Sequence, residues 1–274
     1  MRTILINPQW QGSADLTVYH GAMELQKRYL MGQEAAIVPV STDETDVAEK
    51  ENGIIAWKRL KQQTERAYHM LLQANPDTVL SIGGGCDADV ATIVYLSRKY
   101  KGRLGVIWLD AHGDLNTPAE SETSLFYGMP LRSVLDAHCF GLLENDCPIK
   151  AEQVVHIGAR DLDAAEEAFM ERVQMRRIRV EELQKGEKPL ETLLPMEADQ
   201  VYIHLDLDVL DPSFFPETPL PVEHGLSGEA LCSILNTLRE KAVGLGIYEY
   251  KPCGREYAIL NWLMEYGMTL QRRG

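Results

Sequence analysis

This 274-residue sequence has little positive charge, because it contains 27 lysines and arginines against 41 acidic residues, and its formal net charge is −14. A protein that binds nucleic acid or an anionic membrane surface needs a positive patch, so neither is expected as a partner. Long apolar runs are also missing, since the longest have only the length of a strand. The start MRTILINPQW has no basic segment followed by a long apolar run, and we expect a cytoplasmic protein.

Cysteine is sparse as well. The five cysteines are an odd number and lie far apart, at positions 86, 139, 147, 232 and 253. A chain of this size can bury a large core without disulfides, so reduced thiols are expected. The sequence shows no internal repeat, low-complexity tract or Gly/Ser linker. With 45% apolar and 25% charged residues it has the composition of a globular protein, and residues 1–274 are expected to form a single domain.

Short, β-rich apolar runs alternate with longer stretches that suit helices. The expected strands are Thr3–Ile6, Ala35–Val40, Thr78–Ile82, Leu104–Leu109, Val154–Ile157, Val201–Leu205 and Val243–Tyr248. The expected helices are Asp46–Gln73 (as one helix or two), Ala88–Lys99, Ala164–Arg172, Ser227–Lys241 and Arg255–Tyr266. This alternation predicts an α/β fold with a mainly parallel sheet of about eight strands and helices on both faces. Loops at the carboxyl ends of such strands bind ligands, and the proline-rich stretch 212–221 is expected to be one.

Acidic and imidazole side chains follow the expected strand Leu104–Leu109. In the run LGVIWLDAHGD, Asp110, His112 and Asp114 come directly after it, at the carboxyl edge of the predicted sheet. If the chain stays extended there, Asp110 and His112 share a face, because side chains alternate along a strand. A polar turn after a buried strand would also explain these residues, since turns favour Asp.

A second acidic segment, VYIHLDLDVLDP, ends another buried strand. Asp206 and Asp208 have the same i, i+2 spacing and should project to one side, with Asp211 and Pro212 forming the turn that follows. Carboxylates gathered at one edge repel one another and resist desolvation unless cations neutralise them. The two segments therefore predict a metal site, and oxygen-rich ligation suits Mn²⁺ or Mg²⁺. Two ions roughly 3.5–4 Å apart can generate and hold a hydroxide nucleophile, which makes hydrolysis the expected reaction class.

These motifs carry a resemblance to a known family. Asp-Ala-His-x-Asp followed by Asp-x-Asp-x-x-Asp-Pro resembles the ureohydrolases, which comprise arginases, agmatinases and formiminoglutamases, over a region from about residue 81 to about residue 249. The resemblance implies an arginase-like fold, a homo-oligomer, two divalent ions (Mn²⁺ first) and hydrolysis of a linear C–N bond in a small guanidino or amidino substrate. In the family's pattern Asp110 and Asp206 would bridge the ions, Asp114 would hold one ion, and His112 with Asp208 would hold the other.

The resemblance also implies substrate-binding and catalytic residues. Glu249, at the end of the expected strand Val243–Tyr248, matches the acid that receives the substrate's guanidinium, and it would be catalytic together with Asp114. Asn116, Thr123 and Asp163 match the groups that hold the amino-acid end of arginine, although polar residues after strands are also common in loops without such a role. Their joint occurrence favours an arginine-like, urea-releasing substrate over a bare amine.

Three positions depart from the family's pattern. The run IGGGCDAD places Cys86 where the first metal ligand is usually a histidine. A thiolate there would shift preference toward Zn²⁺ or Fe²⁺, whereas a neutral thiol would hold a metal loosely. Tyr127 stands in place of a proton-shuttling histidine, and a phenol with a reference pKa of about 10 is a poor shuttle that can still donate a hydrogen bond. Leu220 replaces a hydroxyl residue, and the nearby His224 could act as a shuttle or merely cap its loop.

These departures keep other hypotheses open. A catalytically weak family member could act as a regulatory or assembly subunit, and agmatinase- or formiminoglutamase-type activity is a further alternative. A zinc deacetylase has a related fold and an Asp-x-His element, but the paired catalytic histidines of such enzymes have no counterpart here. The glycines at 83–85 lack the rest of a dinucleotide or phosphate-loop motif.

His204 lies two residues before Asp206, and we expect it to orient a metal-binding carboxylate.

Overall fold

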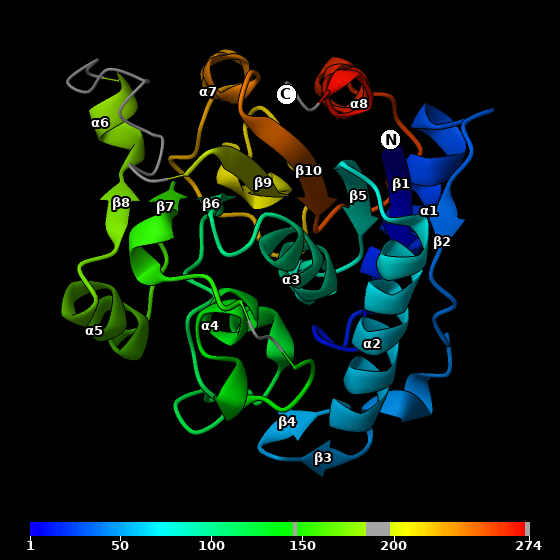
Figure 1. The fold of residues 1–274 in the computed structure, drawn as a ribbon. Helices are drawn as coiled ribbons and strands as arrows, with labels where there is room; N and C mark the ends of the chain where they lie inside the picture. Colours follow the sequence, from blue (N-terminus) through cyan, green and yellow to red (C-terminus); the bar gives the residue numbers. More distant parts are fainter. Residues whose placement is uncertain (145–146, 185–197, 272–274) are drawn as a thin grey trace.

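An eight-stranded parallel sheet forms the centre of the computed structural model, which describes residues 1–144, 147–184 and 198–271 (Figure 1). The strand order is β2-β1-β5-β10-β9-β6-β7-β8, and every neighbouring pair is parallel. The strands are β1 (Arg2–Asn7), β2 (Ala36–Ile37), β5 (Thr78–Gly83), β6 (Leu104–Leu109), β7 (Val154–Ile157), β8 (Arg176–Ile178), β9 (Gln200–Asp206) and β10 (Ala242–Tyr248). The predicted α/β class and parallel sheet are confirmed.

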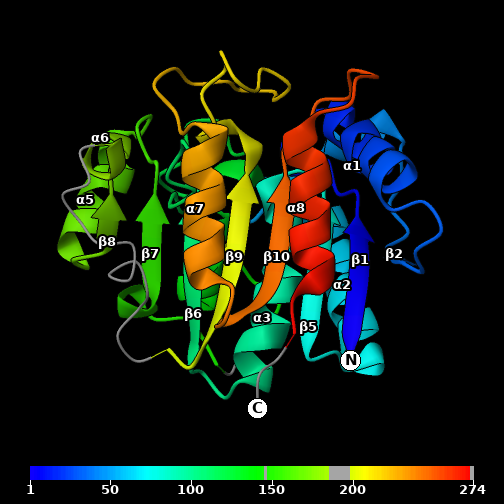
Figure 2. The same cartoon turned by 90° about the horizontal axis from the view of Figure 1, so that it is seen from above.

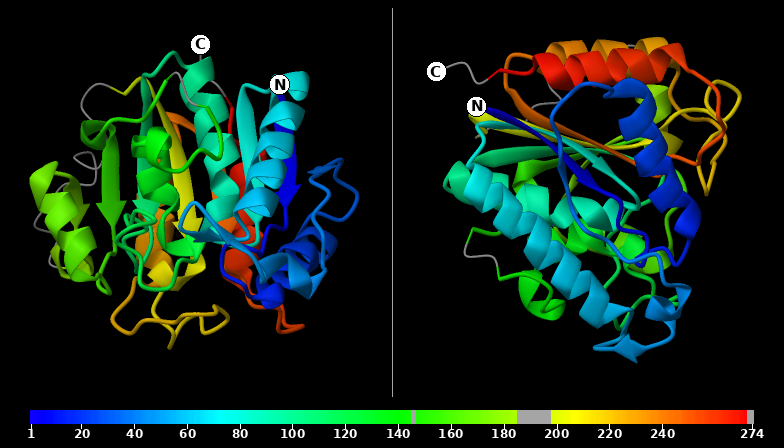
Figure 3. Two further views of the ribbon diagram at one scale, coloured as in Figure 1. Left: turned by 90° about the horizontal axis from the view of Figure 1, so that it is seen from below. Right: turned by 90° about the vertical axis from the view of Figure 1, so that its right-hand side faces the viewer.

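Helices cover both faces of this sheet, as Figures 2 and 3 show. The α-helices are α1 (Leu16–Tyr29), α2 (Trp57–Ala74), α3 (Val90–Lys99), α4 (Pro130–Leu135), α5 (Ala164–Arg172), α6 (Val180–Gln184), α7 (Gly228–Leu238) and α8 (Ala258–Thr269). One hydrophobic core joins the sheet to α1, α7 and α8, and the other joins it to α2, α3 and α4. Successive strand residues face opposite cores, so Ile107 packs on the first core and Trp108 on the second. Within the described ranges, none of the helices combines the length and apolar character needed to cross a bilayer.

The stretch expected as helix Asp46–Gln73 contains more than a helix. It begins with a 3-10 turn, Glu44–Val47, and continues into an antiparallel hairpin of β3 (Lys50–Glu51) and β4 (Ile54–Ile55) before α2 starts. Asn52 and Gly53 both have positive φ, 52° and 80°, which is the backbone of a tight hairpin turn. The helical expectation was therefore wrong for this first part, because an Asn-Gly turn reverses the chain there.

Two further elements differ from expectation at the same edge of the sheet. The strand expected over Ala35–Val40 pairs with β1 only at Ala36 and Ile37, and Pro39 follows with no N–H to donate. Helix α1 was not expected at all, because Gly21 interrupts its helical pattern. A Cβ at Gly21 would lie 1.7 Å from the Tyr250 carbonyl oxygen, so this glycine lets the helix approach the chain after β10.

Candidate metal centre

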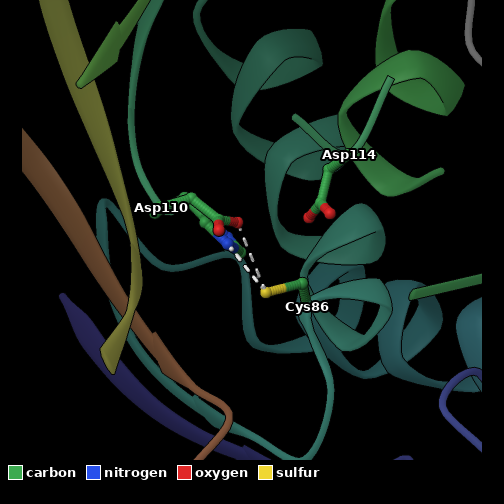
Figure 4. A group of neighbouring side chains, drawn as sticks. Cys86, Asp110 and Asp114 are labelled. Carbon is green, nitrogen blue, oxygen red and sulfur yellow. Dashed lines mark hydrogen bonds between the residues drawn. The ribbon is translucent and has the colours of Figure 1, made fainter. Parts of the chain in front are cut away.

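Four neighbouring strands deliver acidic, imidazole and thiol side chains to one edge of the sheet. β5, β10, β9 and β6 are adjacent and parallel, so the segments that follow them meet. The six predicted metal ligands, Cys86, Asp110, His112, Asp114, Asp206 and Asp208, all belong to groups whose candidate ligand atoms lie within 4.8 Å of one another. In Figure 4 the Cys86 sulfur and the Asp114 carboxylate point into the same space beside Asp110. The structure thus brings together all six residues.

Tight turns, rather than strand alternation, aim these acids. β9 ends at Asp206, and Asp208 lies in a 3-10 turn, Leu207–Val209, where its N–H donates to the Asp206 Oδ1 at 2.8 Å. β6 ends at Leu109, and the N–H of His112 donates to the Asp110 Oδ1 at 2.7 Å. The condition of an extended chain is therefore not met after β6, and the chain after Asp206 also turns, because each first aspartate caps a turn with its own carboxylate. The pairs still converge, with the His112 Nδ1 2.9 Å from the Asp208 Oδ2.

The carboxylates of this cluster are too crowded to ionise together without a cation. Burial, reinforced by neighbouring acids, raises the pKa of Asp114, Asp206 and Glu249 well above the ordinary range. Burial alone would lower the pKa of His112, but its contacts with Asp110 and Asp208 raise that pKa above its usual value. The Asp114 Oδ2 is buried and has no hydrogen-bond partner among the described residues. These oxygen, nitrogen and sulfur donors, one of them unpaired, fit divalent metal ions.

His204 and Glu249 join the candidate ligand groups, although neither was expected as a ligand. The His204 Nε2 lies 3.2 Å from the Cys86 Sγ, and its Nδ1 lies 2.8 Å from the Asp89 Oδ2. His204 was predicted to orient a metal-binding carboxylate, but its ring nitrogens contact the Cys86 thiol and the Asp89 carboxylate instead. The i, i+2 spacing to Asp206 was a signal for His204, but Cys86 lies far away in sequence.

A small cavity opens at the same edge. It is lined by Cys86, His112, Asp114, Tyr127, Asp206, Asp208, Pro219, Leu220 and Glu249. The Glu249 Oε1 accepts the backbone N–H of Cys86 at 3.2 Å, and Glu249 itself has a φ of 58°, a conformation that costs a non-glycine residue energy. Burial raises the pKa of Tyr127 further, so its hydroxyl stays protonated and can serve only as a hydrogen-bond donor or acceptor. His224 lies on the surrounding loop, exposed and outside this lining.

The three residues expected to bind an amino-acid end lie outside the cavity lining. Asn116 and Asp163 do come together, because the Asn116 Nδ2 donates to the Asp163 Oδ2 at 2.7 Å. Asp163 is also the N-cap of α5, where its Oδ1 accepts the N–H groups of Ala165 and Glu166 at 2.8 and 2.9 Å. Thr123 is exposed, and its Oγ1 accepts the Leu125 N–H at 3.2 Å. Asn116 and Asp163 therefore form a hydrogen-bonded pair, whereas the Thr123 hydroxyl bonds within its own loop.

Arg160 was not singled out by sequence, yet it fastens the loop that borders the cavity. Its guanidinium donates to the carbonyl oxygens of Asp208, Val222 and Glu223 at 2.7, 2.8 and 2.9 Å. It thereby joins the turn that holds a candidate ligand to the two residues that directly follow the proline-rich stretch 212–221. Planar guanidinium with its fork of donors suits such multiple contacts. The only sequence signal was its place after a buried strand, beside Asp161 and Asp163.

Comparisons with known proteins point in one direction. The model of the arginase family matches residues 17–258. An arginase of Staphylococcus aureus (strain COL) is 39% identical over 155 residues, which is 54% of this chain and 51% of that protein. An arginase of Coccidioides immitis (strain RS) is 32% identical over 190 residues, covering 64% of this chain and 59% of that protein. The chain thus spans about half the length of these curated relatives.

Solved structures share the fold over nearly the whole chain. The Entamoeba histolytica arginase in complex with L-ornithine superposes with a TM-score of 0.81 at 20% identity, covering 97% of this chain and 96% of that one. The arginase from Bacillus subtilis gives 0.76 at 25% identity, with 97% and 95% covered. The formimidoylglutamase from Bacillus subtilis subsp. subtilis str. 168 gives 0.68 at 19% identity, with 98% and 84% covered. At these identities, the first and third likenesses concern the fold alone.

Proposed function

The chain belongs to the arginase family, and from that premise we propose that it is a binuclear metal-dependent hydrolase that cleaves a linear C–N bond in a guanidino or amidino compound. An arginine-like substrate that releases urea is the leading case. The observation that carries this proposal is that four buried acids, together with His112 and Cys86, line one small cavity, while a fifth buried acid, Asp110, belongs to the same candidate ligand groups. Such a cluster suits two divalent ions and a cationic substrate, and little else would neutralise it.

Three residues of the cavity lining, Glu249, Asp114 and Tyr127, have tasks that follow from their positions. When bound, the ions would polarise the substrate and supply a nucleophile near neutral pH. Glu249, at the cavity wall, receives the cationic guanidinium and orients it. Asp114 has an unpaired Oδ2 and could hold a proton on its way to the leaving amine. The Tyr127 hydroxyl, which stays protonated, offers the substrate a hydrogen bond in place of proton transfer.

The amino-acid end of the substrate would be held farther out. We propose Asn116, Asp163 and Thr123 for this role, because the family resemblance matches all three to it and the first two already form a hydrogen-bonded pair. Mn²⁺ is the first metal to test, and Zn²⁺ or Fe²⁺ is the next because Cys86 lies among the ligands. A homo-oligomer, a cytoplasmic location, and the absence of nucleic-acid and membrane partners complete the proposal.

A substrate panel with defined metals tests this function. The chelator-treated protein is loaded with Mn²⁺, Zn²⁺ or Fe²⁺, and product release is measured from arginine, agmatine and formiminoglutamate. We expect urea from arginine at the highest kcat/KM. Glu249→Gln should lower that value at least 100-fold, a scale of about 2.7 kcal/mol, because a neutral amide no longer pairs with the guanidinium. The matched control is Glu223→Gln, an exposed acid on the bordering loop, which should keep wild-type activity.

Two results would contradict this proposal. A clear preference for agmatine would overturn the amino-acid end of the substrate while leaving the chemistry intact. No product from any of the three compounds, with metal shown to be bound, would overturn the hydrolytic function itself.

A further inference from the structure

We infer that His204 is itself a metal ligand, and that with Cys86 it makes one of the two metal positions selective for Zn²⁺ or Fe²⁺ while the other suits Mn²⁺. The inference rests on the proposed function only in assuming that the cluster holds metal. It gives a direct role to a buried histidine that the proposed chemistry does not use. It also explains Cys86, which stands where the family usually has a histidine, as a ligand that acts together with His204.

The distances match those of a metal site. Candidate ligand atoms of Cys86, Asp110, Asp114 and His204 all lie within 4.8 Å of one another, and all four residues are buried. Bond lengths of about 2.3 Å to sulfur and about 2.05 Å to nitrogen or oxygen place two tetrahedral ligands about 3.6 Å apart. The Cys86 Sγ lies 3.2 Å from the His204 Nε2 and 4.0 Å from the Asp110 Oδ2, on either side of that value. Small side-chain shifts would therefore complete a four-ligand site.

The other ring nitrogen of His204 is held as in a metal-binding histidine. Its Nδ1 faces the Asp89 Oδ2 at 2.8 Å, and the Tyr202 hydroxyl donates to the Asp89 Oδ1 at 2.5 Å. With the Nδ1 proton directed to a carboxylate, the Nε2 is the acceptor atom of the ring, and its lone pair faces the Cys86 sulfur at 3.2 Å. A carboxylate behind the distal nitrogen is the usual partner of a metal-ligating imidazole, because it sets the tautomer and raises the basicity of the ligand.

Aromatic stacking fixes the plane of this ring. His204 lies between Trp108, at a centroid distance of 3.5 Å and an interplanar angle of 8°, and Tyr248, at 4.8 Å and 10°. The Trp108 Nε1 in turn donates to the Asp110 Oδ2 at 3.1 Å, so the tryptophan orients two members of the group. A ligand held in this way loses little conformational freedom when a metal binds.

The two metal positions differ in chemistry. The first group contains a sulfur, an imidazole nitrogen and two carboxylates, a set that suits Zn²⁺ or Fe²⁺. Another group, Asp110, His112 and Asp208, contains two carboxylates and one imidazole and suits Mn²⁺. The remaining group, Cys86, Asp206 and Glu249, shares its thiol with the first. Asp110 belongs to the first two groups and could bridge them. The structure therefore favours a mixed pair of ions over two identical ones.

Metal titration of the chelator-treated, full-length protein tests this assignment without any substrate. Calorimetry with Zn²⁺, and absorption spectra with Co²⁺ in its place, report affinity and sulfur ligation. We expect a thiolate-to-cobalt charge-transfer band that Cys86→Ser abolishes. His204→Gln should weaken the first Zn²⁺ at least ten-fold and alter the cobalt spectrum, and Mn²⁺ binding should stay within two-fold. The matched control is His156→Gln, a fully buried histidine that flanks Trp108 from β7 as His204 does from β9 and lies outside the candidate groups.

A second measurement keeps the inference falsifiable if His204→Gln fails to fold. X-ray absorption at the zinc edge, on the wild-type protein with one equivalent of Zn²⁺, should show one sulfur and at least one imidazole nitrogen. Unchanged Zn²⁺ affinity in a folded His204→Gln variant, or a zinc site without sulfur or imidazole, would overturn the inference. Metal bound through His204 without hydrolysis of any guanidino compound would overturn the proposed function alone.

Discussion

Asp163 divides its carboxylate between two tasks. One oxygen caps α5, and the other accepts the side-chain amide of Asn116. Family resemblance pointed to neither contact, because it implied only that Asp163 holds the amino-acid end of a substrate and carries no information on the helix that begins there. Glu166 completes the cap, since its carboxylate accepts the backbone N–H of Asp163 at 3.1 Å. A loss of activity at this position therefore has two possible causes, structural and functional.

A pair of substitutions separates these causes. Asp163→Ala should lower the free energy of unfolding by about 1 kcal/mol through loss of the cap, and Asp163→Ser should restore most of it. Both variants remove the oxygen that contacts Asn116, so both should raise the KM for arginine, while kcat stays nearly constant. Denaturant titration and steady-state kinetics provide the two readouts. If Asp163→Ser had wild-type KM, the proposed contact with substrate would be ruled out.

The histidines show where residue-level prediction stops. Asp110, His112 and Asp114 lie within five residues of one another, so their clustering could be recognised in one short motif. His204 lies on β9, and Cys86 and Asp89, which it contacts, lie in the turn after β5, with β10 between the two strands. Such contacts depend on strand order, which alternating segments do not determine. The sequence therefore indicated that His204 supports the site, while its sulfur partner became visible only in the fold.

At the scale of elements, prediction succeeded where a segment has a clear apolar pattern and well-marked ends. Strands β6 and β7 and helix α5 have the predicted bounds, since buried apolar runs and a complete capping box mark them. The short edge strand β8 was not expected, because Arg176 and Arg177 give it little apolar character. The predicted loop 212–221 does follow β9, beyond its terminal turn, and no strand or helix lies within it.

Arg160 holds the end of that loop through the two residues that directly follow it, Val222 and Glu223. Arg160→Ala removes the donors to Asp208, Val222 and Glu223, and a lysine with one ammonium cannot reach all three carbonyls. We expect faster proteolysis within the loop and a KM raised about five-fold, an effect of about 1 kcal/mol, with the Ala variant more affected than the Lys variant. Limited proteolysis with mass mapping gives the first measurement. Equal cleavage of Arg160→Ala and wild type would show that the loop keeps its conformation without the Arg160 hydrogen bonds.

For the whole molecule, the crowded acids oppose folding until a cation binds. Asp87 adds to them from the turn after β5, where burial raises its pKa to about 7. A native carboxyl with a raised pKa binds a proton that the unfolded chain has already lost. The resulting stability is complete below the unfolded pKa of about 4 and is lost as the pH rises through about 7. The metal-free protein should therefore be more stable in mild acid than at pH 8.

Replacing Asp87 tests this pH dependence. Asp87→Asn has nearly the same shape and never ionises, so it should match wild type at pH 5 and exceed it at pH 8 by on the order of 3 kcal/mol at most. Chemical unfolding of the metal-free proteins at both pH values provides the measurement. Asp43→Asn, an exposed acid far along the chain from this turn, serves as the control. An Asp87→Asn variant with the wild-type pH profile would show that Asp87 titrates normally.

The stacked trio of Trp108, His204 and Tyr248 also gives the molecule an optical signal. Its indole lies parallel to the imidazole at a centroid distance of 3.5 Å and donates to Asp110. A paramagnetic ion bound by Asp110 and His204 would lie beside the Trp108 indole and would quench its fluorescence efficiently. Zinc, with a filled d shell, would not quench in this way. In a variant that keeps Trp108 as its only tryptophan of the four, the emission would thus distinguish which kind of ion occupies the position beside it.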